Sequence, residues 1–150
     1  MNVAYFLTPK SEVGCIYDDC TVRQGLEKMK RSGFTALPVV TRANRYVGTI
    51  SEGDFLWYLV QEQAKTGEEL HRIRMKDMEN VIVRDVLGFD RNPPVRITAG
   101  MDQLVHRAMN QNFVPVIDDL GSFIGIVTRK DIIRYFYEKN VRPVPAPEYA

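Results

Sequence analysis

Two short stretches of the sequence combine a hydroxyl, charged side chains and a carboxylate at the same spacing. Thr128-Arg129-Lys130-Asp131 follows one apolar run, and Ser51-Glu52-Gly53-Asp54 follows another. Both fit a helix capping box, in which the hydroxyl and the carboxylate each accept from a backbone amide. The same geometry could bind a ligand: the helix N-terminus attracts anions, the hydroxyl can donate to a phosphate, and the aspartate can accept from two ribose hydroxyls. The spacing alone favours the cap.

The two stretches differ in charge. Arg129 and Lys130 offer two cations to a phosphate, and Arg129 could bind one bidentately. Glu52 and Gly53 stand at the matching positions, where the carboxylate of Glu52 would repel a phosphate. We therefore expect the stretch at Thr128 to bind an anion better.

The chain repeats itself, which must be recognised before its motifs are interpreted. Five identities share an offset of 77 residues: Pro38 and Pro115, Val39 and Val116, Gly48 and Gly125, Asp54 and Asp131, Tyr58 and Tyr135. Further upstream the offset is 80, where Leu7 matches Leu87. The sequence predicts that the second copy lacks three residues near Gln111.

Each copy predicts the same order of elements, and therefore a mixed α/β (α+β) fold. Hydrophobic periodicity and β-branched content indicate a short helix, an extended segment, an amphipathic helix, two strands and a closing helix. In the first copy these are residues 3–7, 14–17, 22–29, 36–41, 45–51 and 54–65; in the second they are 83–87, 94–97, 101–108, 113–118, 122–128 and 131–139. Pro38 and Pro115 cannot donate to a ladder, so each is expected at a strand start or on an edge.

Composition excludes several classes of protein. The apolar fraction of 45% is ordinary for a globular chain, and a net charge of +1 argues against a nucleic-acid surface. No apolar run is long enough to span a bilayer, and the N-terminus lacks the features of a signal peptide. Cys15 and Cys20 are expected to be free thiols, and His71 and His106 lack the neighbours of a metal site.

The repeated order, with an apolar-Pro-Val strand and a G-h-x-[ST]-x-x-D motif in both copies, resembles a tandem pair of CBS (cystathionine β-synthase) domains. The resemblance extends over roughly residues 3–139. It predicts repeat 1 with an N-terminal helix at 1–66, a linker at 67–80, repeat 2 at 81–139 and a proline-rich tail at 140–150. It also implies two β-α-β-β-α repeats that pack through their sheets with pseudo-two-fold symmetry. In that family two clefts between the repeats commonly bind adenine nucleotides, pairs often dimerise, and the role is regulatory.

The resemblance pairs the last motif of one repeat with the residues before the apolar-Pro-Val strand of the other. Cleft A would contain Gly14, Phe34, Thr35 and Ala36 with Thr128, Arg129, Lys130 and Asp131; a second, weaker cleft B would contain Arg96, Asn112 and Phe113 with Ser51 and Asp54. Phe34 could stack on a base or be an ordinary core residue. Phe113 stands where Ala36 stands and is bulky where a base needs space. We expect cleft A to be the main site.

The ligand suggested by this pattern is an adenine nucleotide: AMP, ADP, ATP or cyclic di-AMP. Phe34-Thr35-Ala36 together with Thr128-Arg129-Lys130 resembles small stand-alone bacterial CBS proteins that bind cyclic di-AMP. The expectation is a cytoplasmic sensor without a cofactor, a nucleic-acid partner or a membrane anchor, which signals to an unknown protein target. The alternative is a structural dimerisation module without a nucleotide. No catalytic set is visible.

The two closing helices are rich in aromatic residues. Trp57 and Tyr58 lie on the first, and residues 135–137 on the second. Such a stripe is more typical of a helix interface than of a cofactor site. We expect it to form a homodimer face.

Overall fold

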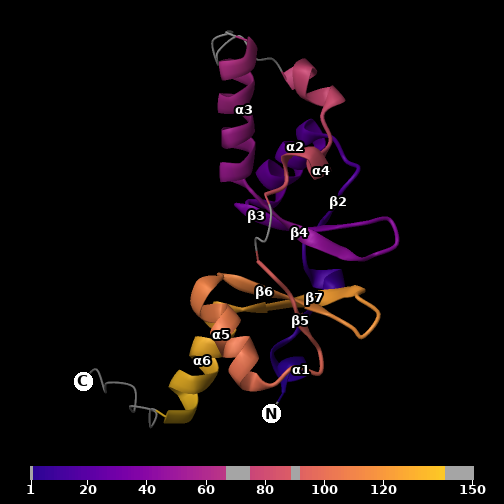
Figure 1. Ribbon diagram of the computed structural model, residues 1–150. Helices are drawn as coiled ribbons and strands as arrows, with labels where there is room; N and C mark the ends of the chain where they lie inside the picture. The colour runs from indigo at the N-terminus through magenta and orange to yellow at the C-terminus, as the bar shows by residue number, and fades with distance from the viewer. Residues whose placement is uncertain (1, 67–74, 89–91, 141–150) are drawn as a thin grey trace, which may run out of the picture.

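The computed structural model describes residues 2–66, 75–88 and 92–140. In Figure 1 the sheets of the two repeats lie next to one another in the middle of the molecule, and the helices lie towards its two ends. Repeat 1 contains β2 (Ile16–Tyr17), α2 (Val22–Ser32), β3 (Ala36–Val40), β4 (Tyr46–Ser51) and α3 (Glu52–Thr66). Repeat 2 contains β5 (Val95–Arg96), α5 (Met101–Asn110), β6 (Phe113–Ile117), β7 (Phe123–Thr128) and α6 (Arg129–Asn140). The predicted mixed α/β fold with two repeats is confirmed.

The segment before each repeat packs with the other repeat. α1 (Val3–Phe6) and β1 (Thr8–Pro9) open the chain, and β1 pairs antiparallel with β7 of repeat 2. Conversely, the 3₁₀ helix η3 (Met75–Asn80) and α4 (Val83–Val86) lie beside α2 of repeat 1 (Figure 1). The sequence placed the N-terminal helix with repeat 1; in space it belongs to the core of repeat 2.

The two hydrophobic cores record this exchange. One core joins Val3 and Phe6 of α1 to buried residues of repeat 2, among them Leu104 and Val127. The other joins Met78 and Val83 to buried residues of repeat 1: Ile16, Val22, Met29, Leu37, Val39, Ile50 and Phe55. Because neither core is complete without a segment from the other half of the chain, the repeats fold as one unit.

Pro38 and Pro115 lie in interior strands of their sheets, although the sequence predicted a strand start or an edge for each. The sheets run in the order β2-β3-β4 and β1-β7-β6-β5, so β3 and β6 are interior strands. However, β2 pairs only with Val39 and Val40, and β5 only with Val116 and Ile117. Pro38 therefore has no registered partner on the β2 side, where its missing amide costs no ladder bond. The same holds for Pro115.

The three residues missing from the second copy are not all near Gln111. Val3 and Val83 begin α1 and α4 at an offset of 80, but Ile16 and Val95 hold the same place in their sheets at 79, and Val39 and Val116 at 77. One residue is therefore lost before β5 and two around the end of α5. α2 ends on Gly33 in a left-handed conformation (φ 71°), whereas α5 ends on extended Gln111.

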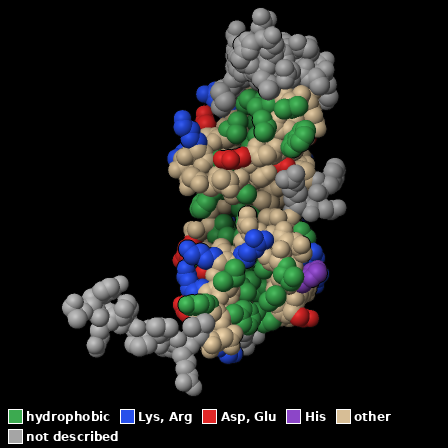
Figure 2. All heavy atoms as spheres, turned by 90° about the vertical axis from the view of Figure 1, so that its left-hand side faces the viewer, with side chains coloured by type: hydrophobic (Ala, Val, Ile, Leu, Met, Phe, Trp, Pro, Cys, Tyr) green, Lys and Arg blue, Asp and Glu red, His purple; other side chains and the backbone are tan. Residues whose placement is uncertain are grey.

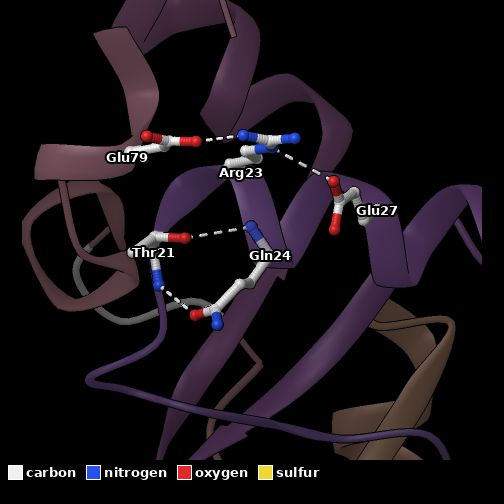
Figure 3. A network of polar contacts seen from close by, with 5 residues as sticks. All are labelled: Thr21, Arg23, Gln24, Glu27 and Glu79. Atoms are coloured by element: carbon white, nitrogen blue, oxygen red, sulfur yellow. Dashed lines mark hydrogen bonds and ion pairs between the residues drawn. The ribbon is translucent and has the colours of Figure 1, made fainter. Parts of the chain in front are cut away.

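The start of α2 is fixed by polar contacts that also hold η3 (Figure 3). Thr21 and Gln24 form a reciprocal capping box, with the Thr21 hydroxyl 3.1 Å from the Gln24 amide and the Gln24 side chain 2.9 Å from the Thr21 amide. Arg23 pairs with Glu27 one turn along the helix and with Glu79 of η3. The cap and the arginine thus join the linker segment to repeat 1.

The repeats meet at the β3–β4 turn and the start of β7. The Phe123 amide donates to the Asn44 carbonyl (2.8 Å), and the Asn44 side chain donates to the Phe123 carbonyl (3.0 Å). The Tyr46 ring stacks on Phe123, and its hydroxyl donates to the Asn92 carbonyl (2.7 Å). Burial raises the pKa of Tyr46, so the hydroxyl stays protonated as a donor.

Candidate functional site

Both closing helices begin against the residues that precede the middle strand of their own repeat. The Glu52 amide donates to the Thr35 carbonyl (3.0 Å), and the Arg129 amide donates to the Asn112 carbonyl (2.9 Å). The two bonds are related by the offset of 77 residues. The motif of repeat 1 thus lies beside Thr35, and the motif of repeat 2 lies beside Asn112.

Both repeated hydroxyls cap a helix, as their spacing predicts. The Asp54 amide lies 3.3 Å from Ser51 Oγ, and the Asp131 amide lies 3.2 Å from Thr128 Oγ1. Each bond satisfies one of the amides that a helix start leaves unpaired. The difference between the copies lies in their carboxylates.

The Asp54 carboxylate completes its capping box. Its Oδ2 accepts from the Ser51 amide (2.8 Å) and from Ser51 Oγ (3.1 Å), and the residue is only 6% exposed. A buried carboxylate held in this way has a structural role. A ribose in cleft B would have to compete with these bonds.

The Asp131 carboxylate is not used in this way. Its side chain is 36% exposed, and Oδ1 lies 3.9 Å from Arg134 Nη1. Within the described ranges it accepts no hydrogen bond. It borders a cavity of about 350 Å³ that is also lined by Leu7, Thr8 and Tyr135. This carboxylate can therefore accept hydrogen bonds from a ligand.

Arg129 points in an unexpected direction. Its Nε donates to the Ala108 carbonyl at the end of α5 (2.7 Å), and its side chain lines a cavity of about 390 Å³ between α5 and α6 with Met109 and Ile133. The sequence expected Arg129 to face a phosphate beside Asp131; its Nε instead ties α6 to α5. Lys130 is exposed on the first turn of α6.

The other half of cleft A is a surface patch on repeat 1. A side chain on Gly14 would meet the Phe34 ring at 3.6 Å, so these two residues are neighbours. Phe34 is 52% exposed, which contradicts the alternative of a buried core phenylalanine. Thr35 is exposed beside it and Ala36 is half-buried. A flat ring could stack here without displacing core side chains.

The two halves of cleft A are linked through the N-terminal segment. Thr8 of β1 pairs with Ile126, two residues before Thr128, and η1 (Lys10–Glu12) then contacts β7 and leads to Gly14. No hydrogen bond among the described residues joins Phe34, Thr35 or Ala36 directly to residues 128–131. The Asp131 cavity is lined by the N-terminal segment and α6 and not by Gly14 or residues 34–36, so the pairing of the two halves stays a prediction.

Cleft B has a different composition. Arg96 and Asn112 are exposed, and Phe113 is half-buried and pairs with Thr128 across the β6–β7 ladder. Ser51 and Asp54 face each other in their own cap. The amide of Gln111 donates to two backbone carbonyls at this edge, of Pro93 (3.3 Å) and Phe113 (3.2 Å). In cleft B the side chains of Ser51, Asp54 and Gln111 are therefore engaged in hydrogen bonds within the protein.

Two residues were missed by sequence reasoning. Thr8 lines the Asp131 cavity because β1 pairs with β7 of repeat 2. The sequence feature that could have indicated this position is the match of Leu7 with Leu87 upstream of the two repeats. Gln111 was noticed only as the place where the repeat offset changes. Its bonds depend on Pro93, which lies 18 residues away in the chain.

Other candidate sites give little support to different chemistry. Within the described residues, no three His, Cys, Asp or Glu side chains gather as metal ligands, and no helix is long and apolar enough to cross a membrane. Cys15 and Cys20 are free thiols. Both line a cavity of about 620 Å³ between β2 and α2, a groove that contains none of the predicted cleft residues.

Comparison with known proteins decides the family. Residues 6–61 and 83–138 each match the family model described as the CBS domain. The chain belongs to the CBS-domain family. The resemblance given by the repeated motif is thereby confirmed, and CBS-domain proteins are generally regulatory.

Individual relatives agree with this assignment. An uncharacterized protein of Methanocaldococcus jannaschii is 31% identical over 114 residues, which is 72% of this chain but 38% of that relative. The crystal structure of CbpB in complex with c-di-AMP is 26% identical, with a TM-score of 0.76 over 91% of this chain and 84% of that one. CBSX2 in complex with AMP is 23% identical, with a TM-score of 0.71 over 93% and 98% of the two chains, and supports the CBS fold alone.

Proposed function

We propose that this CBS pair is a regulatory module that binds an adenine nucleotide in cleft A and signals the bound state to a partner protein. The observation that carries the proposal is the Asp131 carboxylate, which borders a cavity beside a capped helix start and accepts no hydrogen bond in the described part of the chain. That a structural neighbour was crystallised with c-di-AMP supports this class of ligand.

Each residue of cleft A has a distinct task in this proposal. Asp131 accepts from the ribose hydroxyls, and the N-terminus of α6 with Lys130 attracts the phosphate. Phe34 stacks on the base, Thr35 offers a hydroxyl and Gly14 and Ala36 leave space. Arg129 holds α6 against α5 through Ala108, and so acts on the site by positioning.

The ligand would act by bridging the repeats. Phe34 and Ala36 belong to repeat 1 and Asp131 to repeat 2, so a nucleotide that contacts both stabilises one arrangement of the two sheets. A partner that binds this arrangement better would sense the nucleotide. Because these residues provide binding groups without a nucleophile and base in contact, we propose no catalysis and no cofactor.

A thermal-shift panel tests the proposal. AMP, ADP, ATP, adenosine, S-adenosylmethionine, cyclic di-AMP and cyclic di-GMP would be compared at equal concentration. A ligand at a hundred times its dissociation constant adds about 2.7 kcal/mol of stability, which is a shift of several degrees for a chain of this size. We expect an adenine compound to give this shift, and Asp131→Ala to abolish it.

The matched control is Asp54→Ala, which changes the equivalent aspartate in cleft B. We expect it to keep most of the ligand-induced shift, whereas Arg129→Ala weakens it only in part because Arg129 faces α5. A flat panel for the wild-type protein would refute nucleotide binding. The chain would then be better explained as a module that binds proteins only.

A further inference from the structure

Gln111 occupies in repeat 2 the position that Phe34 occupies in repeat 1. The next residues, Thr35 and Asn112, accept the same helix amide through their carbonyls. The neighbours also correspond: the Phe34 ring lies against Gly14, two residues before β2, and the Gln111 amide lies against Pro93, two residues before β5. The two positions thus have corresponding backbone neighbours and differ in side-chain chemistry and in exposure.

The Gln111 amide uses both of its hydrogens on backbone carbonyls. Nε2 lies 3.3 Å from the Pro93 oxygen and 3.2 Å from the Phe113 oxygen, and the residue is 6% exposed. A primary amide has two N–H donors, so both are satisfied, one by the segment before β5 and one by the start of β6. Removing the amide would leave two carbonyls without this donor.

The corresponding carbonyls of repeat 1 belong to Gly14 and Ala36. Within the described residues neither accepts a hydrogen bond from a side chain, because Phe34 has no donor and its ring is half exposed. Repeat 1 therefore offers two carbonyl acceptors at the positions that correspond to the pair bound by one –NH₂ group in repeat 2. The exocyclic amine of an adenine base is such a group, with two hydrogens on nitrogen attached to a planar carbon.

We propose that Gln111 is an internal substitute for the base in cleft B, where its amide makes the hydrogen bonds that an aminopurine makes to Gly14 and Ala36 in cleft A. Gln111 thus acts as a plug that closes cleft B, so that one chain binds one base. The inference rests on the proposed nucleotide function and adds the residue that makes its two clefts unequal. In cleft A the two carbonyl acceptors would select a base with an amino group, because inosine presents a carbonyl to them instead.

Calorimetric titration with adenosine tests the plug, since this probe has no phosphate for Glu52 to repel. Three proteins would be compared: wild type, Phe113→Ala and the double variant Gln111→Ala/Phe113→Ala. The single variant removes the bulky ring and keeps the plug, so the difference between the two variants isolates Gln111. We expect about one adenosine per chain for wild type and Phe113→Ala, and about two for the double variant, with inosine at least tenfold weaker throughout.

The outcomes separate the plug from the proposed function. One site in the double variant, or two in the wild type, would overturn the plug and leave nucleotide binding in cleft A intact. Adenosine binding to none of the three proteins would overturn the plug, whereas the proposed function fails only if the thermal-shift panel of nucleotides is flat as well. Circular dichroism would confirm that each variant is folded before it is titrated.

Transplanting the plug into cleft A gives a second test that does not depend on opening cleft B. Phe34→Gln places the amide beside Gly14 and Ala36, and Phe34→Asn carries the same amide on a side chain one methylene shorter. Both lose ring stacking equally, so their difference measures the plug. We expect adenosine to bind Phe34→Gln at least tenfold more weakly than Phe34→Asn, and equal affinities would contradict the inference.

Discussion

The two aspartates of the repeated motif have the same sequence context and different roles. Asp54 is buried and accepts two hydrogen bonds from Ser51, whereas Asp131 is partly exposed and lies 3.9 Å from Arg134. A carboxylate bound within the fold contributes to stability, and a carboxylate left accessible can serve a ligand. The asymmetry between clefts A and B therefore begins with single side chains.

This difference predicts unequal effects on the free energy of unfolding. Asp54→Ala removes half of a capping box and should lower the free energy of unfolding by about 1–2 kcal/mol. Asp131→Ala should change it by less than about 0.5 kcal/mol, since a long, exposed ion pair contributes little. Urea denaturation without nucleotide measures both values. Equal losses would mean that Asp131 also has a structural role.

At the residue level, the sequence predicted the hydroxyls and carboxylates of both motifs because their local spacing defines a helix cap. It failed for Arg129 and Gln111, whose side chains bind the carbonyls of Ala108 and Pro93. Those acceptors come from other elements, and their positions depend on packing. Spacing within one motif carries no information about them.

At the scale of elements, the exchange of N-terminal segments explains why both motifs begin with glycine. A side chain on Gly125 would lie 2.2 Å from the carbonyl oxygen of Thr8, because β1 pairs antiparallel with β7 and Pro9 lies opposite Gly125. The three atoms nearest to a side chain on Gly48 would all belong to Leu87, with Cδ2 at 3.1 Å. The order and type of the elements could be predicted from hydrophobic periodicity. The exchange could not, because it depends on which of two similar cores each short helix enters.

The two glycines make a matched pair for testing the exchange. Gly125→Ala forces a methyl group into a backbone oxygen and should cost about 3 kcal/mol. Gly48→Ala requires only a flexible leucine to move and should cost less than about 1 kcal/mol. Unfolding in urea measures the cost, and proteolysis near the N-terminus should accelerate in Gly125→Ala alone. Equal losses of stability in the two variants would contradict the close contact between β1 and β7 at Gly125.

At the scale of the whole molecule, the repeats present matching apolar side chains on one face. Leu56 and Val60 of α3 correspond to Ile133 and Tyr137 of α6, and all four are exposed. Figure 2 shows hydrophobic side chains gathered on this face over both repeats. The aromatic residues of the two closing helices are only partly exposed for such a contact. Trp57 is exposed, whereas Tyr135 packs on Phe6 in the core of repeat 2.

This face is suited to a second copy of the chain. A patch repeated by pseudo-two-fold symmetry can meet itself across a two-fold axis, with each α3 or α6 facing a helix of the partner. Single exposed apolar residues need no explanation, but apolar groups exposed at equivalent positions on both closing helices favour an interface. We therefore propose a homodimer through α3 and α6.

Charges at the centre of this face should separate the dimer. Leu56→Glu/Ile133→Glu places a carboxylate at the same position in each repeat, where a two-fold contact would bury it without a partner. We expect light scattering after gel filtration to give the mass of a dimer for wild type and of a monomer for this variant, with a dissociation constant raised at least about tenfold. Leu120→Glu is the control, because Leu120 is as exposed but lies in the β6–β7 turn away from both helices. A wild-type monomer, or a variant that remains dimeric, would remove this face as the site of assembly and leave the nucleotide to act within a single chain.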